Sequence, residues 1–162
     1  MTKLPNALPA DPAVLADYLS AMEVARAYTF HIDQRDWSAY ADLFGETVKV
    51  DYEPRKPGIP TDRIPSKEWA KGAKKSLGKL KATHHTMSPY AVRFEGEGAT
   101  VTSYCSARHY EPSVEGDPTF TEHSVYELAL VRNGDGWLID TVHARVLWTE
   151  GNRSVLFHEL ED

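Results

Sequence analysis

The sequence predicts a single α+β domain in which N-terminal helices precede an antiparallel β-sheet. Apolar residues recur at every third or fourth position in the first third of the chain, as they do on one face of a helix. Four strand-like segments follow in the second half, with Gly-containing turns at 95–98 and 133–136, which are typical of hairpins. Helices followed by an antiparallel sheet is the α+β arrangement.

Length and composition limit the classes of function. The 162 residues, of which 41% are apolar and 26% charged, suit one domain. Lysine and arginine number 18 against 24 acidic residues, and such a chain repels nucleic-acid phosphates. No apolar run reaches the roughly 18 residues that span a bilayer. The single Cys105 and the absence of a signal peptide favour a cytoplasmic protein.

The helical part of the chain is predicted in order. Residues 1–12 contain three prolines and form an extended arm. A helix is predicted from residue 13 to about 33, and Asp36 is placed to cap a short second helix over 37–44. Ser66 is expected to cap a third helix. The domain is predicted to span 13–153, followed by a tail over 154–162.

The strands are predicted from alternation and turns. Residues 48–52 alternate like a strand, and a proline-rich loop follows up to residue 65. The four later strands cover about 82–95, 98–112, 119–133 and 136–149. A curved sheet around helices leaves a concave pocket, which is the usual place for a small-molecule site.

Residues of one parity on a strand share one face of the sheet. The set from Ala99 to His109 is small or apolar, so His109 is expected inside. His84 shares parity with Val92 and Phe94 and is therefore favoured over His85 for the inner face, whereas a bulge at Pro89 would shift the count and favour His85. On the last strand, the same argument places Arg145 inside. An isolated buried histidine is also explained by packing alone.

Asp33 is the acidic candidate, because it lies near the end of the first helix. A negative charge there opposes the helix dipole by up to about 1 kcal/mol and therefore needs a partner. An ion pair with Arg35 or a turn hydrogen bond would satisfy Asp33 without any role in function. The helix-capping role of Asp36 is a sufficient explanation for that residue.

Several segments together resemble the SnoaL-like polyketide cyclase/dehydratase family over roughly residues 15–153. The most specific is the D-x-x-D-W segment that begins at Asp33, and the others are Asp51-Tyr52, Thr83-His84-His85, Arg108-His109-Tyr110, His123-Ser124 and Gly136-Trp137. The resemblance implies the nuclear transport factor-like fold, a cone-shaped, curved, mixed or antiparallel β-sheet wrapped around N-terminal helices.

Within this superfamily the motifs are most similar to scytalone dehydratase and the bile acid 7α-dehydratase, which are cofactor-free lyases. The resemblance implies that Asp33 pairs with a catalytic histidine, matched to His84, and that Tyr52 polarises a substrate carbonyl. It also implies catalytic roles for His109 and Tyr28. The expected substrate-binding residues are His85, Ser124, Tyr126 and Arg145. Because Tyr126 stands where scytalone dehydratase has asparagine, the substrate is expected to differ from scytalone.

The expected function is therefore a cofactor-independent, metal-free dehydratase that acts on a small, apolar, cyclic hydroxy-carbonyl compound. Histidine exchanges protons near neutral pH, and a carboxylate fixes its tautomer. A polyketide cyclase or a ketosteroid-isomerase-like enzyme would use the same groups. A non-catalytic ligand-binding or adaptor protein is the alternative from another class.

Self-association is expected because the tail contains Val155-Leu156-Phe157 and Leu160, which need an apolar surface. The resemblance suggests a trimeric homo-oligomer, with a dimer as the alternative. In the competing interpretation, the tail packs over the pocket of its own chain.

Overall fold

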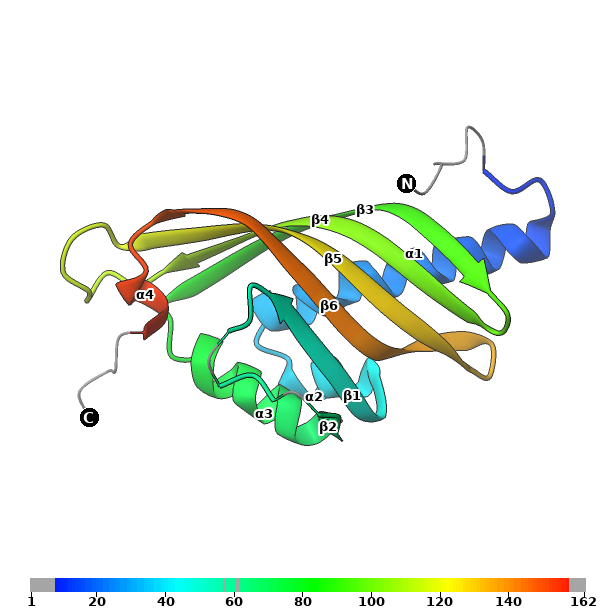
Figure 1. Cartoon of the computed structure of the whole chain (residues 1–162), viewed down its shortest axis with the longest axis horizontal. Coiled ribbons are helices and arrows are strands. Elements are labelled where there is room, and N and C mark those ends of the chain that lie inside the picture. The colour runs from blue at the N-terminus through cyan, green and yellow to red at the C-terminus, as the bar shows by residue number, and fades with distance from the viewer. Residues whose placement is uncertain (1–7, 57, 61, 158–162) are drawn as a thin grey trace.

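The computed structural model describes residues 8–56, 58–60 and 62–157 and has an α+β fold (Figure 1). The elements in chain order are α1 (Pro12–Asp33), α2 (Trp37–Asp42), β1 (Phe44–Glu53), β2 (Ile64–Pro65), α3 (Ser66–Leu77), β3 (Ala82–Glu95), β4 (Gly98–Tyr110), β5 (Thr119–Asn133), β6 (Gly136–Gly151) and α4 (Ser154–Phe157). The predicted fold class is confirmed. The predicted arm over 1–12 lies largely outside the described residues.

The strands form one curved sheet in the order β2-β1-β6-β5-β4-β3. β3 to β6 are joined by antiparallel pairing, as predicted, whereas β1 runs parallel to β6. The sheet is therefore mixed. The helix α1 lies along one face of the long strands (Figure 1) and packs against β3, β4 and β6. None of the helices in the described residues combines the length and apolar content needed to cross a bilayer.

The predicted cap at Asp36 is confirmed, and α1 begins with a cap at Asp11 that was not predicted. Asp11 accepts the amide of Ala13 at 2.8 Å and caps α1, and Asp36 accepts the amide of Ala39 at 3.0 Å and caps α2. The prediction that Ser66 caps α3 is wrong. Ser66 is already the first helical residue, and its hydroxyl donates to the carbonyl of Gly45 at 2.6 Å, which ties α3 to β1.

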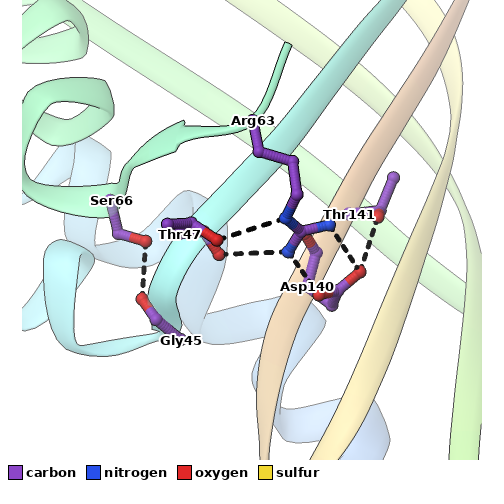
Figure 2. Close-up of polar contacts among 6 residues, drawn as sticks. All are labelled: Gly45, Thr47, Arg63, Ser66, Asp140 and Thr141. Carbon is purple, nitrogen blue, oxygen red and sulfur yellow. Dashed lines mark hydrogen bonds and ion pairs between the residues drawn. The ribbon is translucent and has the colours of Figure 1, made fainter.

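Arg63 fastens the far end of the proline-rich loop to the sheet. Figure 2 shows its guanidinium between Thr47 of β1 and Asp140 of β6. The Nε group donates to the Thr47 hydroxyl at 3.1 Å, and the terminal nitrogens contact the Asp140 carboxylate. Thr141 donates a further hydrogen bond to that carboxylate. These contacts hold the loop end against β1 and β6.

The core lies between α1 and the concave face of the sheet. From α1 it contains Ala21, Ala25, Tyr28 and Ile32, and from the sheet it contains fully buried residues such as Val101, Leu128, Ile139 and Val142. A second, smaller cluster closes one end of the sheet around Leu80, Val114, Phe120 and Val155. This packing places the C-terminal end of α1 next to the inner faces of β3 and β4.

Two β-bulges decide which side chains face inward. The register of β3 against β4 shifts between Pro89 and Ala91, which reverses parity. His85 consequently faces inward and His84 is exposed, so the prediction that His84 faces the interior is wrong. A similar shift at Asp140 in β6 turns Arg145 outward, where it is exposed. The expected place of Arg145 inside the pocket is also wrong.

Candidate active site

Asp33 and His85 form a hydrogen-bonded pair at the end of α1. The ring Nδ1 of His85 lies 2.7 Å from Asp33 Oδ1, and the backbone amide of His85 donates to Asp33 Oδ2 at 2.7 Å. The hydroxyl of Thr83 also donates to Oδ1 at 2.8 Å. The His85 side chain is 8% exposed and that of Asp33 15%. Since Nδ1 faces the carboxylate, Nε2 is the ring nitrogen that can exchange a proton with a ligand.

The electrostatics of Asp33 favour its charged form. Burial raises the pKa of Asp33, but the hydrogen bonds from His85 and Thr83 outweigh it and hold the pKa below its ordinary value. The carboxylate is therefore ionised at neutral pH and can stabilise a positive charge on His85. Arg35 does not take this place, because its guanidinium donates to the carbonyl of Leu80 at 3.3 Å and lies against the Trp37 ring.

His109 lies beside this pair on β4. Its ring is perpendicular to that of His85 with the centroids 5.7 Å apart, and its Nδ1 lies 3.3 Å from the carbonyl of Phe120. Burial, reinforced by the nearby His85, lowers the pKa of His109 to about 3. His109 is therefore neutral at physiological pH, with Nδ1–H donating to the carbonyl and Nε2 left as an acceptor.

The predicted tyrosines gather on the other side of the concave face. The hydroxyls of Tyr52 and Tyr126 lie 3.3 Å apart. Tyr28 packs against Tyr126 with ring centroids 6.0 Å apart and also contacts Tyr40. Burial raises the pKa of Tyr52 to about 12 and that of Tyr28 and Tyr126 well above the ordinary value. All three hydroxyls stay protonated and can donate hydrogen bonds.

Ser124 and Glu122 lie on β5 at the same inward parity as Tyr126. The hydroxyl of Ser124 is buried and lies 3.4 Å from Glu122 Oε1. Glu122 is itself buried and forms an ion pair with Lys56 from the proline-rich loop, at 2.7 Å. Sequence reasoning missed Glu122 and Lys56. The inward parity that Glu122 shares with Ser124 could have identified it, whereas no periodicity locates a residue in a loop.

Two further features complete the surroundings. Burial raises the pKa of Cys105 to about 12, so its thiol stays protonated and acts as a packing group. A cleft of about 150 Å³ lies between β1 and the loop and includes Tyr52, Arg55 and Ile59 in its lining. In the described part of the chain, no group of three or more His, Cys, Asp or Glu side chains is arranged to hold a metal ion.

Comparisons with known proteins place this geometry in context. The sequence profile of the SnoaL-like domain matches residues 13–143. The Kfla4162 protein from Kribbella flavida is 22% identical with a TM-score of 0.76, over 83% of this chain and 93% of that one. A candidate scytalone dehydratase from Novosphingobium aromaticivorans is 21% identical with a TM-score of 0.68, over 82% and 85% of the two chains.

A third similar structure is the hexachlorocyclohexane dehydrochlorinase LinA-type3 from Novosphingobium barchaimii, at 12% identity and a TM-score of 0.72, over 93% of this chain and all of that one. At these identities the likeness shows a shared fold. No curated protein matches the chain.

Proposed function

The chain belongs to the SnoaL-like family, and from this premise we propose that it is a cofactor-independent dehydratase that removes water from a cyclic hydroxy-carbonyl compound. The observation that carries the proposal is the Asp33–His85 pair, a histidine oriented by an ionised carboxylate on the concave face of the sheet. A histidine in this arrangement can serve both as a general base and as a general acid.

In the first step, Nε2 of His85 removes the acidic proton from the carbon next to the substrate carbonyl. The electron pair of the broken C–H bond moves into the carbonyl group and places a negative charge on its oxygen. The resulting imidazolium is stabilised by the Asp33 carboxylate at 2.7 Å. The Tyr52 hydroxyl is the proposed donor to the substrate oxygen, directly or through water.

In the second step, the electron pair of the enolate returns to form the carbon–carbon double bond, and the bond to the β-hydroxyl breaks. The imidazolium of His85 gives its proton to the departing hydroxide, which leaves as water. His85 is thereby restored to its neutral form, so that the cycle needs no redox partner. His109 is proposed as a second polar contact for the substrate, because its neutral ring lies beside His85.

The proposed substrate is apolar and cyclic. Small or apolar residues occupy the inward strand positions near the dyad and the tyrosines, namely Met87, Cys105, Ala107 and Ala144. Such side chains favour contact with a hydrocarbon ring, and the dyad and Tyr52 are the proposed partners of its hydroxyl and carbonyl groups. Ser124 and Tyr126 are proposed to contact the substrate from β5.

A panel of cyclic β-hydroxy ketones tests the proposal through the absorbance of the conjugated enone product. We expect turnover by the wild-type protein and its loss in Asp33→Asn, which preserves side-chain shape while removing the charge. Isomerised or ring-closed products from the same panel would instead favour the isomerase or cyclase alternative. Ligands that bind without reacting, equally well in wild type and Asp33→Asn, would favour a binding protein and contradict the dehydratase.

A further inference from the structure

An ion pair between the half-buried Lys56 and the buried Glu122 faces the same interior as the Asp33–His85 dyad. The ammonium of Lys56 lies 2.7 Å from both carboxylate oxygens of Glu122. The Glu122 side chain is only 8% exposed and that of Lys56 33%. The ammonium also lies 4.2 Å from the centroid of the Tyr52 ring, a cation–π distance. Lys56 therefore stands over the proposed carbonyl-polarising residue.

The strand register places the ion pair opposite the dyad. His85 of β3 is paired with Ala107 of β4, and Ala107 is in turn paired with Glu122 of β5. The three residues form one row across the concave face, so His85 and Glu122 lie two strand spacings, about 10 Å, apart at the backbone. The residue between them carries only a methyl group. A substrate ring above Ala107 would have the dyad on one side and the ion pair on the other.

Charge balance argues for a role of the cation in the reaction. Proton transfer to His85 leaves a new negative charge on the substrate oxygen. Glu122 alone would oppose that charge, since it is a buried carboxylate beside the same site. The ammonium of Lys56 has three donors and can contact Glu122 and a second oxygen together. With Lys56 in place, each anion of the charge-separated state has a cation beside it.

We propose that Lys56 is a catalytic residue that stabilises the enolate oxygen of the substrate together with Tyr52, and that Glu122 is the positioning residue that holds its ammonium. The assignment rests on the proposed dehydratase function. The charge of Lys56 acts on groups at this position. Burial raises the pKa of Cys105 and Lys56 opposes that rise, while burial lowers the pKa of His109 and Lys56 lowers it further.

A mutational cycle tests whether Lys56 stabilises the enolate oxygen or only neutralises the charge of Glu122. Lys56→Met is expected to lower kcat about 10²- to 10³-fold, the range for losing one oxyanion donor, with a smaller change in KM. Lys56→Arg keeps the cation and should retain part of the rate. Glu122→Gln keeps the cation but loosens its position, so it should give an intermediate loss. Lys71→Met and Glu68→Gln are matched controls from an exposed ion pair on α3.

The double variant Lys56→Met/Glu122→Gln decides between the two roles. It removes both charges, so no carboxylate is left buried without a partner, and its melting temperature should exceed that of Lys56→Met. The proposal predicts that its kcat stays as low as that of Lys56→Met. Recovery of the wild-type rate in the double variant would show that Lys56 only neutralises Glu122, and it would overturn the proposal.

Binding of 4-nitrophenol provides a readout that needs no substrate, since its ionised form absorbs visible light and its oxyanion mimics an enolate. At a fixed pH we expect the probe bound to the wild type to be more ionised than the free probe. The increase in probe ionisation on binding should fall about tenfold in Lys56→Met and in the double variant. Equal ionisation in wild type and Lys56→Met, or no binding to the wild type, would contradict the oxyanion site.

The two readouts also distinguish this proposal from the proposed function. If no hydroxy ketone reacts but probe ionisation depends on Lys56, the dehydratase proposal fails and the oxyanion site stands. If elimination is catalysed and depends on His85 while Lys56→Met retains the wild-type kcat and probe ionisation, the dehydratase stands and the role of Lys56 is wrong.

Discussion

The carboxylate of Asp33 accepts two hydrogen bonds from His85, one from the ring Nδ1 and one from the backbone amide, both at 2.7 Å. The pair joins the last residue of α1 to the inner face of β3. It explains why an acidic residue is stable at a helix end that disfavours negative charge, because the compensating donors come from another element. It also presents Nε2 of His85 as the nitrogen available to a ligand.

Asp33→Asn tests this double contact. An asparagine amide has one acceptor and one donor group, whereas both contacts from His85 require acceptors. With His85 in the Nδ1–H tautomer one bond is lost, and keeping both contacts requires the ring to change tautomer, so we expect the free energy of unfolding to fall by about 1–3 kcal/mol, measured by urea titration. Nitrogen NMR of the His85 ring should show the Nδ1–H tautomer in the wild type and a mixture in the variant. An unchanged tautomer and stability would contradict the geometry.

The Tyr52–Tyr126 hydroxyl pair predicts unequal effects of two matched substitutions. Tyr52→Phe removes the proposed donor to the substrate oxygen and should lower kcat by up to about 10²- to 10³-fold, and by less if water takes its place. Tyr126→Phe leaves that donor intact and should have the smaller effect. Steady-state kinetics on one substrate compares the two. A larger loss in Tyr126→Phe would assign the contact to Tyr126 instead.

His109 predicts an acid-dependent loss of stability. Burial lowers its pKa from the ordinary 6.5 to about 3, so the unfolded chain binds a proton that the folded chain resists. The free energy of unfolding therefore does not depend on the protonation of this histidine above pH 6.5. It decreases as the pH falls towards 3, by up to roughly 1.4 kcal/mol per pH unit. Urea titrations between pH 7 and 4 should show this slope in the wild type and a shallower one in His109→Gln. Equal slopes would contradict a neutral, buried His109.

The C-terminal residues bear on self-association. Val155 of α4 is buried against Leu80 and Phe120 in the cluster at one end of the sheet, not over the candidate site, whereas Phe157 is 64% exposed. Leu160 lies outside the described residues. The homo-oligomer, with a trimer favoured, remains a prediction. Light scattering at micromolar concentration is expected to report a multiple of the 18.2 kDa chain mass, and a monomer mass would refute it.

Local sequence patterns predicted the elements of the fold well. The four later strands and both Gly-containing hairpin turns lie where alternation and turn residues indicated. The parallel pairing of β1 with β6 was not predicted from residue patterns, because it joins segments about ninety residues apart and no local signal encodes it. Resemblance to the family supplied only the expectation of a mixed or antiparallel sheet.

The candidate site was predicted in composition but not in detail. Asp33, at the end of α1, meets the inner face of β3, and Tyr52, His109, Ser124 and Tyr126 lie on the concave face; their catalytic and binding roles remain predictions. His84 and Arg145 were misplaced because a bulge of one residue reverses the parity of everything beyond it. Pro89 indicated the bulge in β3 as an alternative, whereas no residue pattern indicated the one at Asp140. Lys56 was missed because only tertiary structure brings the loop over β5.

The matched pair His84→Ala and His85→Ala tests the central claim most directly, since the two residues are adjacent in sequence and lie on opposite faces of β3. His85→Ala is expected to lower kcat roughly 10²- to 10⁴-fold, the range for losing a general acid or base. His84→Ala, at an exposed position, should keep the wild-type rate. If a substrate is turned over and His85→Ala retains the wild-type rate, or if His84→Ala alone loses activity, the proposed catalytic role of the Asp33–His85 pair is wrong.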